Sequence, residues 1–150
     1  MRVIPLAGLG TFLAVLLLGA LSAYGTLPLM IAPFGATCVL IFASHSSPLS
    51  QPVNVIGGHV VSAIVGVACA VIWPASFVVA AIVVALALMA MMVLRVVHPP
   101  AGATALIGYT TPAGFMFVLF PVLVGSVILV GVAYVYHTTI EAQYPLHPPK

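Results

Sequence analysis

Few residues in this 150-residue chain are able to do polar chemistry, so each of them weighs heavily in the interpretation. Hydrophobic residues make up 64% of the sequence, and charged residues make up 3%. Glu141 is the only acidic residue, so the chain offers no pair of carboxylates for general acid–base catalysis. No pattern of a nucleophile beside an activating base is present either. We therefore predict that the protein is not an enzyme.

A repeated five-residue string is the clearest motif. It reads PFGAT at residues 33–37 and PAGAT at residues 100–104. Proline is favoured at the start of a helix, and the small residues after it leave the first backbone amides accessible. Those amides and the helix dipole favour an anion, while each threonine adds a hydroxyl donor or bonds back to the backbone. The predicted binding residues are Gly35, Ala36, Thr37, Gly102, Ala103 and Thr104.

Arg95 and two histidines are the other candidates for this site. Arg95 lies just before His98, which opens the predicted second half-helix two residues ahead of the second string. An ionisable residue inside a membrane segment usually marks function. We predict that Arg95 and His98 attract the anion; the alternative for Arg95 is an anchor at the membrane interface. His59 is predicted to line the pathway, or to hydrogen-bond a neighbouring helix. The histidine spacing fits no compact metal motif, so we predict no metal and no cofactor.

The elements that must position these residues are helices in a membrane. Soluble domains carry about 25% charged residues, and a nucleic-acid-binding protein needs a basic face, so both classes are excluded. A spanning helix needs about 20 apolar residues. None of the apolar stretches alternates with polar residues as a barrel strand does. The predicted spans run from Leu6 to Leu27, Val53 to Trp73, Phe77 to Val97 and Phe115 to His137.

Two long connections, residues 28–52 and 98–114, remain apolar in their first halves. Such a connection indicates a re-entrant segment, here a short half-helix after each proline. The predicted fold is therefore an all-α polytopic membrane protein with four transmembrane helices and two re-entrant half-helices. It forms one domain over residues 1–150, with one repeat over about 6–73, a second over about 77–138 and a tail at 139–150. The repeats are either parallel or inverted, and the sequence leaves both open.

Small residues at Gly58, Ser62 and Gly66 form a ridge on the second span. Such a ridge lets another helix approach closely, from the same chain or from a second subunit. Four spans also supply few helices to shield a polar pathway from lipid. We therefore predict a homo-oligomer in the bilayer.

The run from Arg95 to Thr104, RVVHPPAGAT, closely resembles the signature of the HPP family of integral membrane proteins. That family is named for its His-Pro-Pro motif and is described as having four transmembrane helices. The resemblance covers nearly the whole chain, including the helix count, the first PFGAT string and the place of the signature before the last span. His-Pro-Pro alone recurs at residues 147–149, so the longer string HPPAGAT carries the resemblance.

The resemblance implies a transporter of a small inorganic anion. Family members in chloroplasts and cyanobacteria have been associated with nitrite transport, which makes nitrite the first candidate. The expected location is a bacterial inner (plasma) membrane, or a chloroplast envelope for a plastid protein. One alternative is a channel for water or ammonia, in which the half-helix dipoles exclude cations. The other is a membrane protein that does not transport but binds a cofactor or serves as an assembly subunit.

Overall fold

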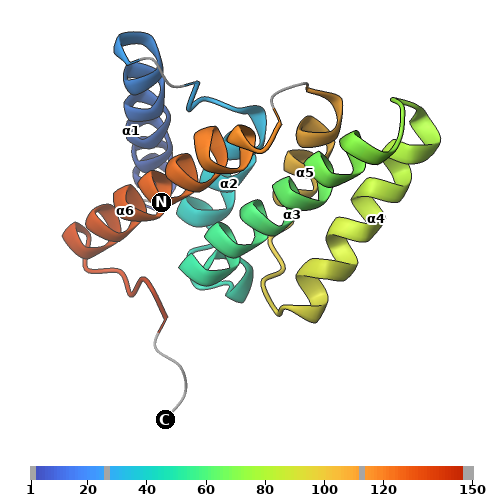
Figure 1. Cartoon of the computed structure of the whole chain (residues 1–150). Helices are drawn as coiled ribbons and strands as arrows, with labels where there is room; N and C mark the ends of the chain where they lie inside the picture. The colour runs from blue at the N-terminus through green and yellow to red at the C-terminus, as the bar shows by residue number, and fades with distance from the viewer. Residues whose placement is uncertain (1–2, 26–27, 112–113, 147–150) are drawn as a thin grey trace.

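The computed structural model describes residues 3–25, 28–111 and 114–146. These ranges contain helices and no strand (Figure 1). The six α-helices are α1 (Val3–Tyr24), α2 (Ala32–Ala43), α3 (Pro52–Ile72), α4 (Phe77–Val93), α5 (Ala101–Thr110) and α6 (Val124–Thr139). A 3₁₀ turn, η1 (Pro48–Ser50), precedes α3, and a π-helical segment, η2 (Val118–Leu123), leads into α6.

Three helical stretches are long and apolar enough to cross a membrane: Ile4–Tyr24, Pro52–Ile72 and Val118–Thr139. The prediction of an all-helical membrane protein is therefore confirmed. α4 is shorter, with 17 residues, and it ends at Val93 rather than at the predicted Val97. The reason is a left-handed turn at Arg95, whose φ is 57° and which occupies a position usually taken by glycine. Val96 N closes this turn by donating to Met91 O at 2.9 Å.

The last long segment is bent rather than straight. Phe120 has a non-helical backbone, with φ −132° and ψ 118°, immediately before Pro121. Proline inside a helix removes one backbone hydrogen bond and clashes with the preceding turn, so it is a usual cause of a kink. The predicted span from Phe115 to His137 therefore consists of η2 followed by α6.

α2 and α5 are the short helices that the repeated string predicts. α2 has 12 residues with Pro33 in its first turn, and α5 has 10 residues directly after Pro100. At 1.5 Å per residue they are about 18 Å and about 15 Å long. Both are shorter than the hydrocarbon core of a bilayer, which is about 30 Å thick. Neither helix alone is long enough to cross it.

The two short helices run in opposite directions (Figure 1). Ser50, just before α3, donates its hydroxyl to Leu40 O at 3.2 Å, so the end of α2 lies beside the start of α3. Asn54, in the first turn of α3, donates to Val97 O at 2.9 Å, which places the segment before α5 at that same end. α5 then continues along α3, with Ala105 O facing Gly66. Hence α5 is parallel to α3, and α2 is antiparallel to it.

The core consists of three clusters of buried apolar side chains, the smallest of which joins Ala63 and Val67 of α3 to Phe117 and Val122. One cluster joins α1, α2 and α6, with fully buried Ala14, Ile41 and Leu129. A second joins α3, α4 and α5, with buried Val83, Ala87 and Ala105. The small-residue ridge of α3 serves this second group, because a Cβ at Gly66 would lie 2.2 Å from Ala105 O. The helix that approaches the ridge closely is α5 of the same chain.

Candidate functional site

Four buried polar side chains meet between the two short helices: Thr37, His59, His98 and Thr104. We call them the His–Thr cluster. Each of them is 0% exposed. Thr37 comes from α2, His59 from α3, His98 from the segment before α5 and Thr104 from α5. The cluster therefore joins both copies of the repeated string to α3, the first of the two long helices that lie between them in sequence.

Hydrogen-bond distances connect the whole cluster. Thr37 Oγ1 lies 2.8 Å from His59 Nε2 and 3.0 Å from His98 Nε2, and it donates to Pro33 O at 3.1 Å. The other ring nitrogen of His59 lies 2.8 Å from Thr104 Oγ1. His98 Nδ1 lies 2.9 Å from Leu49 O, so the network reaches the loop before α3.

Local packing explains why these side chains converge. The ring of Phe34, three residues before Thr37 on α2, meets the edge of the His59 ring at 5.1 Å between centroids. Gly58 leaves space for the segment that carries His98, because a Cβ there would lie 2.6 Å from His98 Cβ. The glycine thus allows His98 to reach the first half of the chain. The sequence indicates this glycine only as part of the ridge.

The remaining predicted binding residues lie beside the cluster rather than in it. Gly35, Ala36 and Ala103 are exposed, and Gly102 is half-buried. The first amides of α5 are also engaged within their own turn. Ala101 N donates to His98 O, Gly102 N to Pro99 O and Ala103 N to Pro100 O. Imidazole nitrogens and hydroxyls are therefore the polar groups that the two half-helices bring together at the centre.

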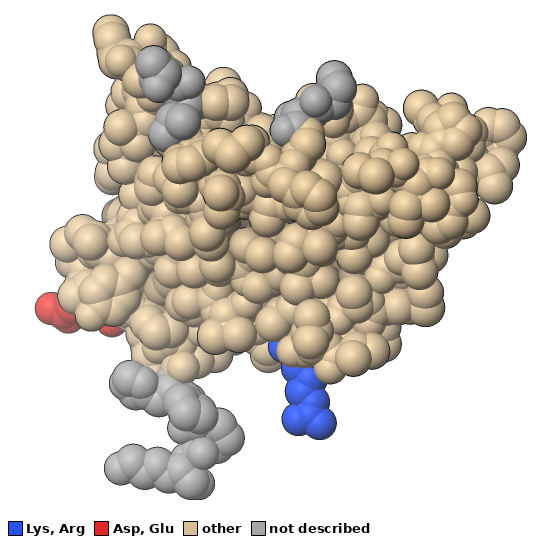
Figure 2. All heavy atoms as spheres, in the orientation of Figure 1, with Lys and Arg blue, Asp and Glu red and all other residues tan. Residues whose placement is uncertain are grey.

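Arg95 lies outside the cluster. Its side chain is exposed, and its backbone ends α4. Figure 2 shows that, among the described residues, charged side chains occupy only small areas of the visible surface. Arg95 is three residues before His98, so it stands at the exposed end of the segment that leads to the cluster.

A second group of aromatic and histidine side chains lies near the end of α6 and is not indicated by the sequence. The ring centroids of His45 and His137 are 4.6 Å apart, and those of His137 and Tyr144 are 5.2 Å apart. Tyr144 donates its hydroxyl to Ser50 O at 3.0 Å, and burial raises the pKa of this phenol. His45 and Tyr144 come from loops, where no periodicity could have revealed their contact. Within the described residues, no group of three or more His, Cys, Asp or Glu is placed to hold a metal ion.

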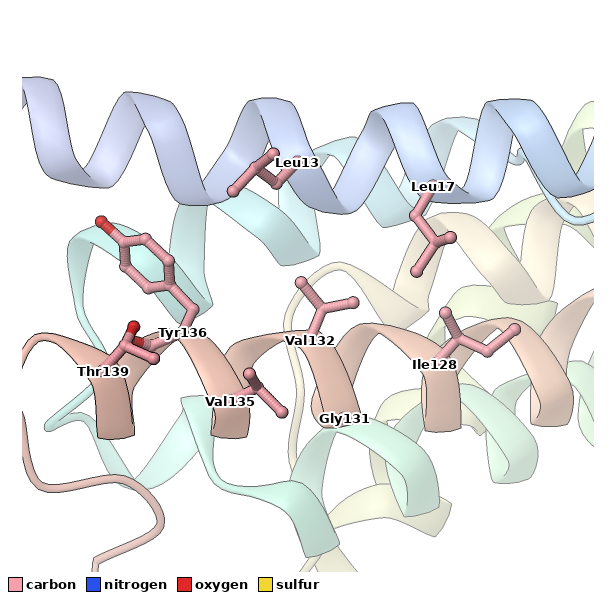
Figure 3. Close-up of a pocket in the computed structure, with 8 residues that line it drawn as sticks. All are labelled: Leu13, Leu17, Ile128, Gly131, Val132, Val135, Tyr136 and Thr139. Atoms are coloured by element: carbon pink, nitrogen blue, oxygen red, sulfur yellow. The ribbon is translucent and has the colours of Figure 1, made fainter.

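An apolar groove of about 490 Å³ lies between α1 and α6, away from the His–Thr cluster. Figure 3 shows Leu13 and Leu17 of α1 facing Ile128 and Val132 of α6 across it. Gly131 adds to the opening, since a Cβ there would meet nothing within 4 Å. Its lining suits lipid or an apolar helix rather than a polar solute.

Comparison with known proteins places these features in context. A family model described as "HPP, transmembrane region" matches residues 1–145. Two proteins of Dictyostelium discoideum, each named only as a transmembrane protein, are similar to the chain. One is 39% identical over 127 residues, which is 79% of this chain and 45% of the relative. The other is 36% identical over 126 residues, covering 78% of this chain and 40% of the relative. This chain therefore matches less than half the length of either relative, and no solved structure matches it.

Proposed function

The chain belongs to the HPP family of transmembrane proteins, and we propose that it carries a small inorganic anion, with nitrite as the first candidate, across the membrane. One observation carries the proposal: two oppositely directed short helices bring four fully buried polar side chains together in a largely apolar protein. Polar groups buried in a membrane protein are expensive and commonly mark a substrate or ion pathway. The choice of nitrite rests on the resemblance of the HPPAGAT string.

We propose that the chain consists of two inverted repeats, α1–α3 and α4–α6. In each, the short helix and the extended segment before it would together make one crossing, beside two longer helices. The opposite directions of α2 and α5 and the repeated string at the start of both support this arrangement. Interrupted segments at matching positions of inverted repeats form the substrate site in many transporters.

In the proposed mechanism, the His–Thr cluster is the narrowest part of the pathway. Imidazole N–H groups and the hydroxyls of Thr37 and Thr104 replace part of the anion's hydration. Arg95, exposed at the start of the segment leading to His98, raises the local anion concentration. Small residues leave space for the anion beside Thr37 and Thr104. They are Gly35, Ala36, Gly102 and Ala103.

A channel for a neutral molecule such as water or ammonia is the second candidate. It is favoured by the lack of any Lys, Arg, Asp or Glu in the cluster and by the bonded amides at the start of α5. Uncharged donors and acceptors in a narrow pore select small neutral solutes. The two candidates differ in whether anion flux or water and ammonia flux depends on the protein.

Proteoliposomes test the two candidates side by side. Purified protein is reconstituted, and initial uptake is measured for nitrite, nitrate, formate, chloride and ammonium, with osmotic water flux measured in parallel. Protein-free vesicles of the same lipid give the background for every solute. We expect protein-dependent nitrite uptake that saturates and exceeds that of chloride. Protein-dependent ammonium or water flux without uptake of any anion would contradict the anion proposal and favour the channel.

We also propose that the protein is a homo-oligomer in a bacterial inner membrane. In the most apolar stretch of α1, only 17% of the residues are buried within the chain. The apolar groove between α1 and α6 lies open beside it. A second copy could cover this face, whereas the ridge of α3 is already filled by α5. Native mass spectrometry in mild detergents tests this proposal. A monomer with undiminished uptake per chain would contradict it.

A further inference from the structure

We propose that the backbone carbonyl of Leu49 sets the direction of every hydrogen bond in the His–Thr cluster, and that Tyr144 is a positioning residue that holds this carbonyl in place. Tyr144 lies in the segment after α6 and has no contact of its own with the cluster side chains. The order of the hydrogens follows from the contacts within the chain, whereas its effect on uptake rests on the proposed anion transport.

The contact between His98 and the loop before α3 determines which ring nitrogen of His98 carries the hydrogen. His98 Nδ1 lies 2.9 Å from Leu49 O. A carbonyl oxygen only accepts, so Nδ1 carries the hydrogen and donates it, and Nε2 of a neutral His98 is then an acceptor. The opposite tautomer would set the lone pair of Nδ1 against that of the carbonyl oxygen and leave a buried nitrogen without a donor, which costs free energy.

The tautomer of His98 then fixes the other hydrogens in turn. His98 Nε2 lies 3.0 Å from Thr37 Oγ1 and needs a donor, which the Thr37 hydroxyl supplies. This hydrogen is free for His98, because Pro33 O already accepts the backbone N–H of Thr37 within α2. Thr37 Oγ1 in turn accepts the hydrogen of His59 Nε2 at 2.8 Å. His59 Nδ1 is therefore an acceptor, and the Thr104 hydroxyl donates to it at 2.8 Å.

The result is one ordered chain of four hydrogen bonds, which begins at Thr104 and ends at the carbonyl of Leu49. Each neutral side chain in it uses its single hydrogen once. A hydroxyl or a neutral imidazole can exchange its donor and acceptor sides, whereas a carbonyl oxygen has no hydrogen to donate. The direction of the whole chain therefore depends on where this one carbonyl lies.

Tyr144 holds the loop that carries this carbonyl. Its hydroxyl donates at 3.0 Å to Ser50 O, the carbonyl next to that of Leu49. Ser50 is 0% exposed and Tyr144 5% exposed, so water has little access to this contact. The following residue, Gln51, accepts the backbone N–H of Leu146 at 2.8 Å, and its amide nitrogen donates to two carbonyls of the same loop. Three consecutive loop residues thus connect the cluster to the segment after α6.

Under the proposed transport, the order decides what an anion meets at the loop end of the cluster. An anion accepts hydrogen bonds, so it can take the place of Leu49 O at His98 Nδ1 only when that nitrogen carries its hydrogen. Arg95, three residues earlier, stands at the exposed end of the segment that leads there. A molecule with the opposite tautomer offers the anion a lone pair instead. Uptake should therefore follow the fraction of molecules in which His98 carries its hydrogen on Nδ1.

The first test reads the order of the hydrogens by ¹⁵N NMR of protein labelled at its histidine rings, in detergent at neutral pH. A ring nitrogen with a hydrogen and one without have well-separated shifts, and the variants His98→Gln and His59→Gln identify the two residues. In wild type we expect the hydrogen on Nδ1 of His98 and on Nε2 of His59. A hydrogen on Nε2 of His98, alone or on both nitrogens, would overturn the inference.

Tyr144→Phe then tests the positioning role, because it removes the hydroxyl and keeps the ring. The Nε2–H form of His98 should rise by up to about tenfold, since one hydrogen bond changes an equilibrium by about that factor at most. Gln51→Ala releases the same loop by another contact and should act in the same direction. Tyr136→Phe is the matched control, because that hydroxyl donates to the carbonyl of Leu6. An unchanged His98 in both Tyr144→Phe and Gln51→Ala would overturn the role of Tyr144.

Nitrite uptake into proteoliposomes, measured per folded molecule, connects the order to transport. Uptake by Tyr144→Phe and Gln51→Ala should fall in proportion to the loss of the Nδ1–H form of His98, while Tyr136→Phe matches wild type. Wild-type uptake rates in variants whose His98 has changed its tautomer would overturn the effect on transport. No protein-dependent uptake by the wild type would overturn the proposed function, and the order read from the nitrogen shifts would still stand.

Discussion

The two short helices begin with nearly the same string but use it differently. On α5, Thr104 has one side-chain partner, His59. On α2, Thr37 contacts His59, His98 and the carbonyl of Pro33. His98 lies two residues before the second string, and the residue at the same place before the first string is the apolar Ile31. The hydroxyl positions are therefore repeated in the two halves, while the imidazoles are not.

Packing around the two short helices also differs. α5 lies directly on α3, where Gly66 faces the backbone oxygen of Ala105. α2 contacts the last helix through a side chain, since a Cβ at Gly125 would lie 2.3 Å from Cε2 of Phe34. A backbone contact cannot move without moving the helix, whereas a ring can rotate. We infer that α5 is held more rigidly than α2, so the α2 side is the better candidate for movement in the proposed transport.

The largest expected effect comes from glycine substitutions that compare these two contacts. Gly66→Ala should destabilise the protein by about 3 kcal/mol and Gly125→Ala by about 2 kcal/mol, because overpacking costs roughly 1–3 kcal/mol. The cost is higher at Gly66 because the backbone of Ala105 can move away less easily than the ring of Phe34. Gly131→Ala, which meets nothing within 4 Å, is the matched control on α6 and should be neutral or slightly stabilising. Thermal unfolding in one detergent measures all three. A larger loss for Gly125→Ala than for Gly66→Ala would reverse the comparison.

The threonines sharpen the comparison further. Thr37→Val removes the partner of two imidazole nitrogens, while Thr104→Val removes the partner of one. Each buried group left unpaired costs about 1–3 kcal/mol, so Thr37→Val should lower the unfolding free energy by roughly twice as much. Thr37→Ser should restore most of the loss because it keeps the hydroxyl. Unfolding midpoints measured at matched protein concentration compare the variants. Equal losses of stability in Thr37→Val and Thr104→Val would show that the two halves are equivalent.

Substitutions at Arg95 distinguish a role in attracting the anion from a role in ending α4. Arg95→Gln should reduce nitrite uptake severalfold at low salt and less at high salt, because about 0.1 M salt screens charges over about 10 Å. Arg95→Lys should retain part of the rate. Arg95→Gly should also lose uptake yet keep or raise stability, since glycine suits the positive φ of 57°. Unchanged uptake per folded molecule in Arg95→Gln would leave Arg95 only its place at the helix end.

The smallest expected effect concerns the tail. Burial raises the pKa of Tyr144 above its ordinary value near 10, so the folded state disfavours the phenolate. The stability that this burial contributes is therefore full below about pH 10 and is lost as the pH rises above it. Tyr144→Phe should cost about 1 kcal/mol at neutral pH and flatten the alkaline part of the stability curve. Thermal unfolding of both proteins across the alkaline range measures this, and parallel curves would contradict it.

Local signals in the sequence were enough for much of the fold. Length and hydropathy predict α1 and α3 within a few residues, and the prolines predict the starts of α2 and α5. α4 ends early because Arg95 adopts a left-handed backbone conformation. Residues with a side chain seldom adopt that conformation, so the sequence does not reveal where this helix ends. Thr37 and Thr104 are singled out by the repeated string, and His98 by the His-Pro-Pro run that leads into its second copy. Their connection through His59 depends on how three helices pack, and no local pattern encodes that.

The central question is whether the anion passes the His–Thr cluster. Protein-dependent nitrite uptake is measured per folded molecule for wild type, Thr37→Val, Thr104→Val and Thr110→Val. Thr110 lies on α5 but is exposed and bonds back to Leu106 O, so it is a matched control outside the cluster. If the anion passes the cluster, Thr37→Val and Thr104→Val should each lower uptake at least about tenfold, equivalent to about 1.4 kcal/mol in the barrier, while Thr110→Val matches wild type. Equal uptake by all four proteins would contradict passage through the cluster.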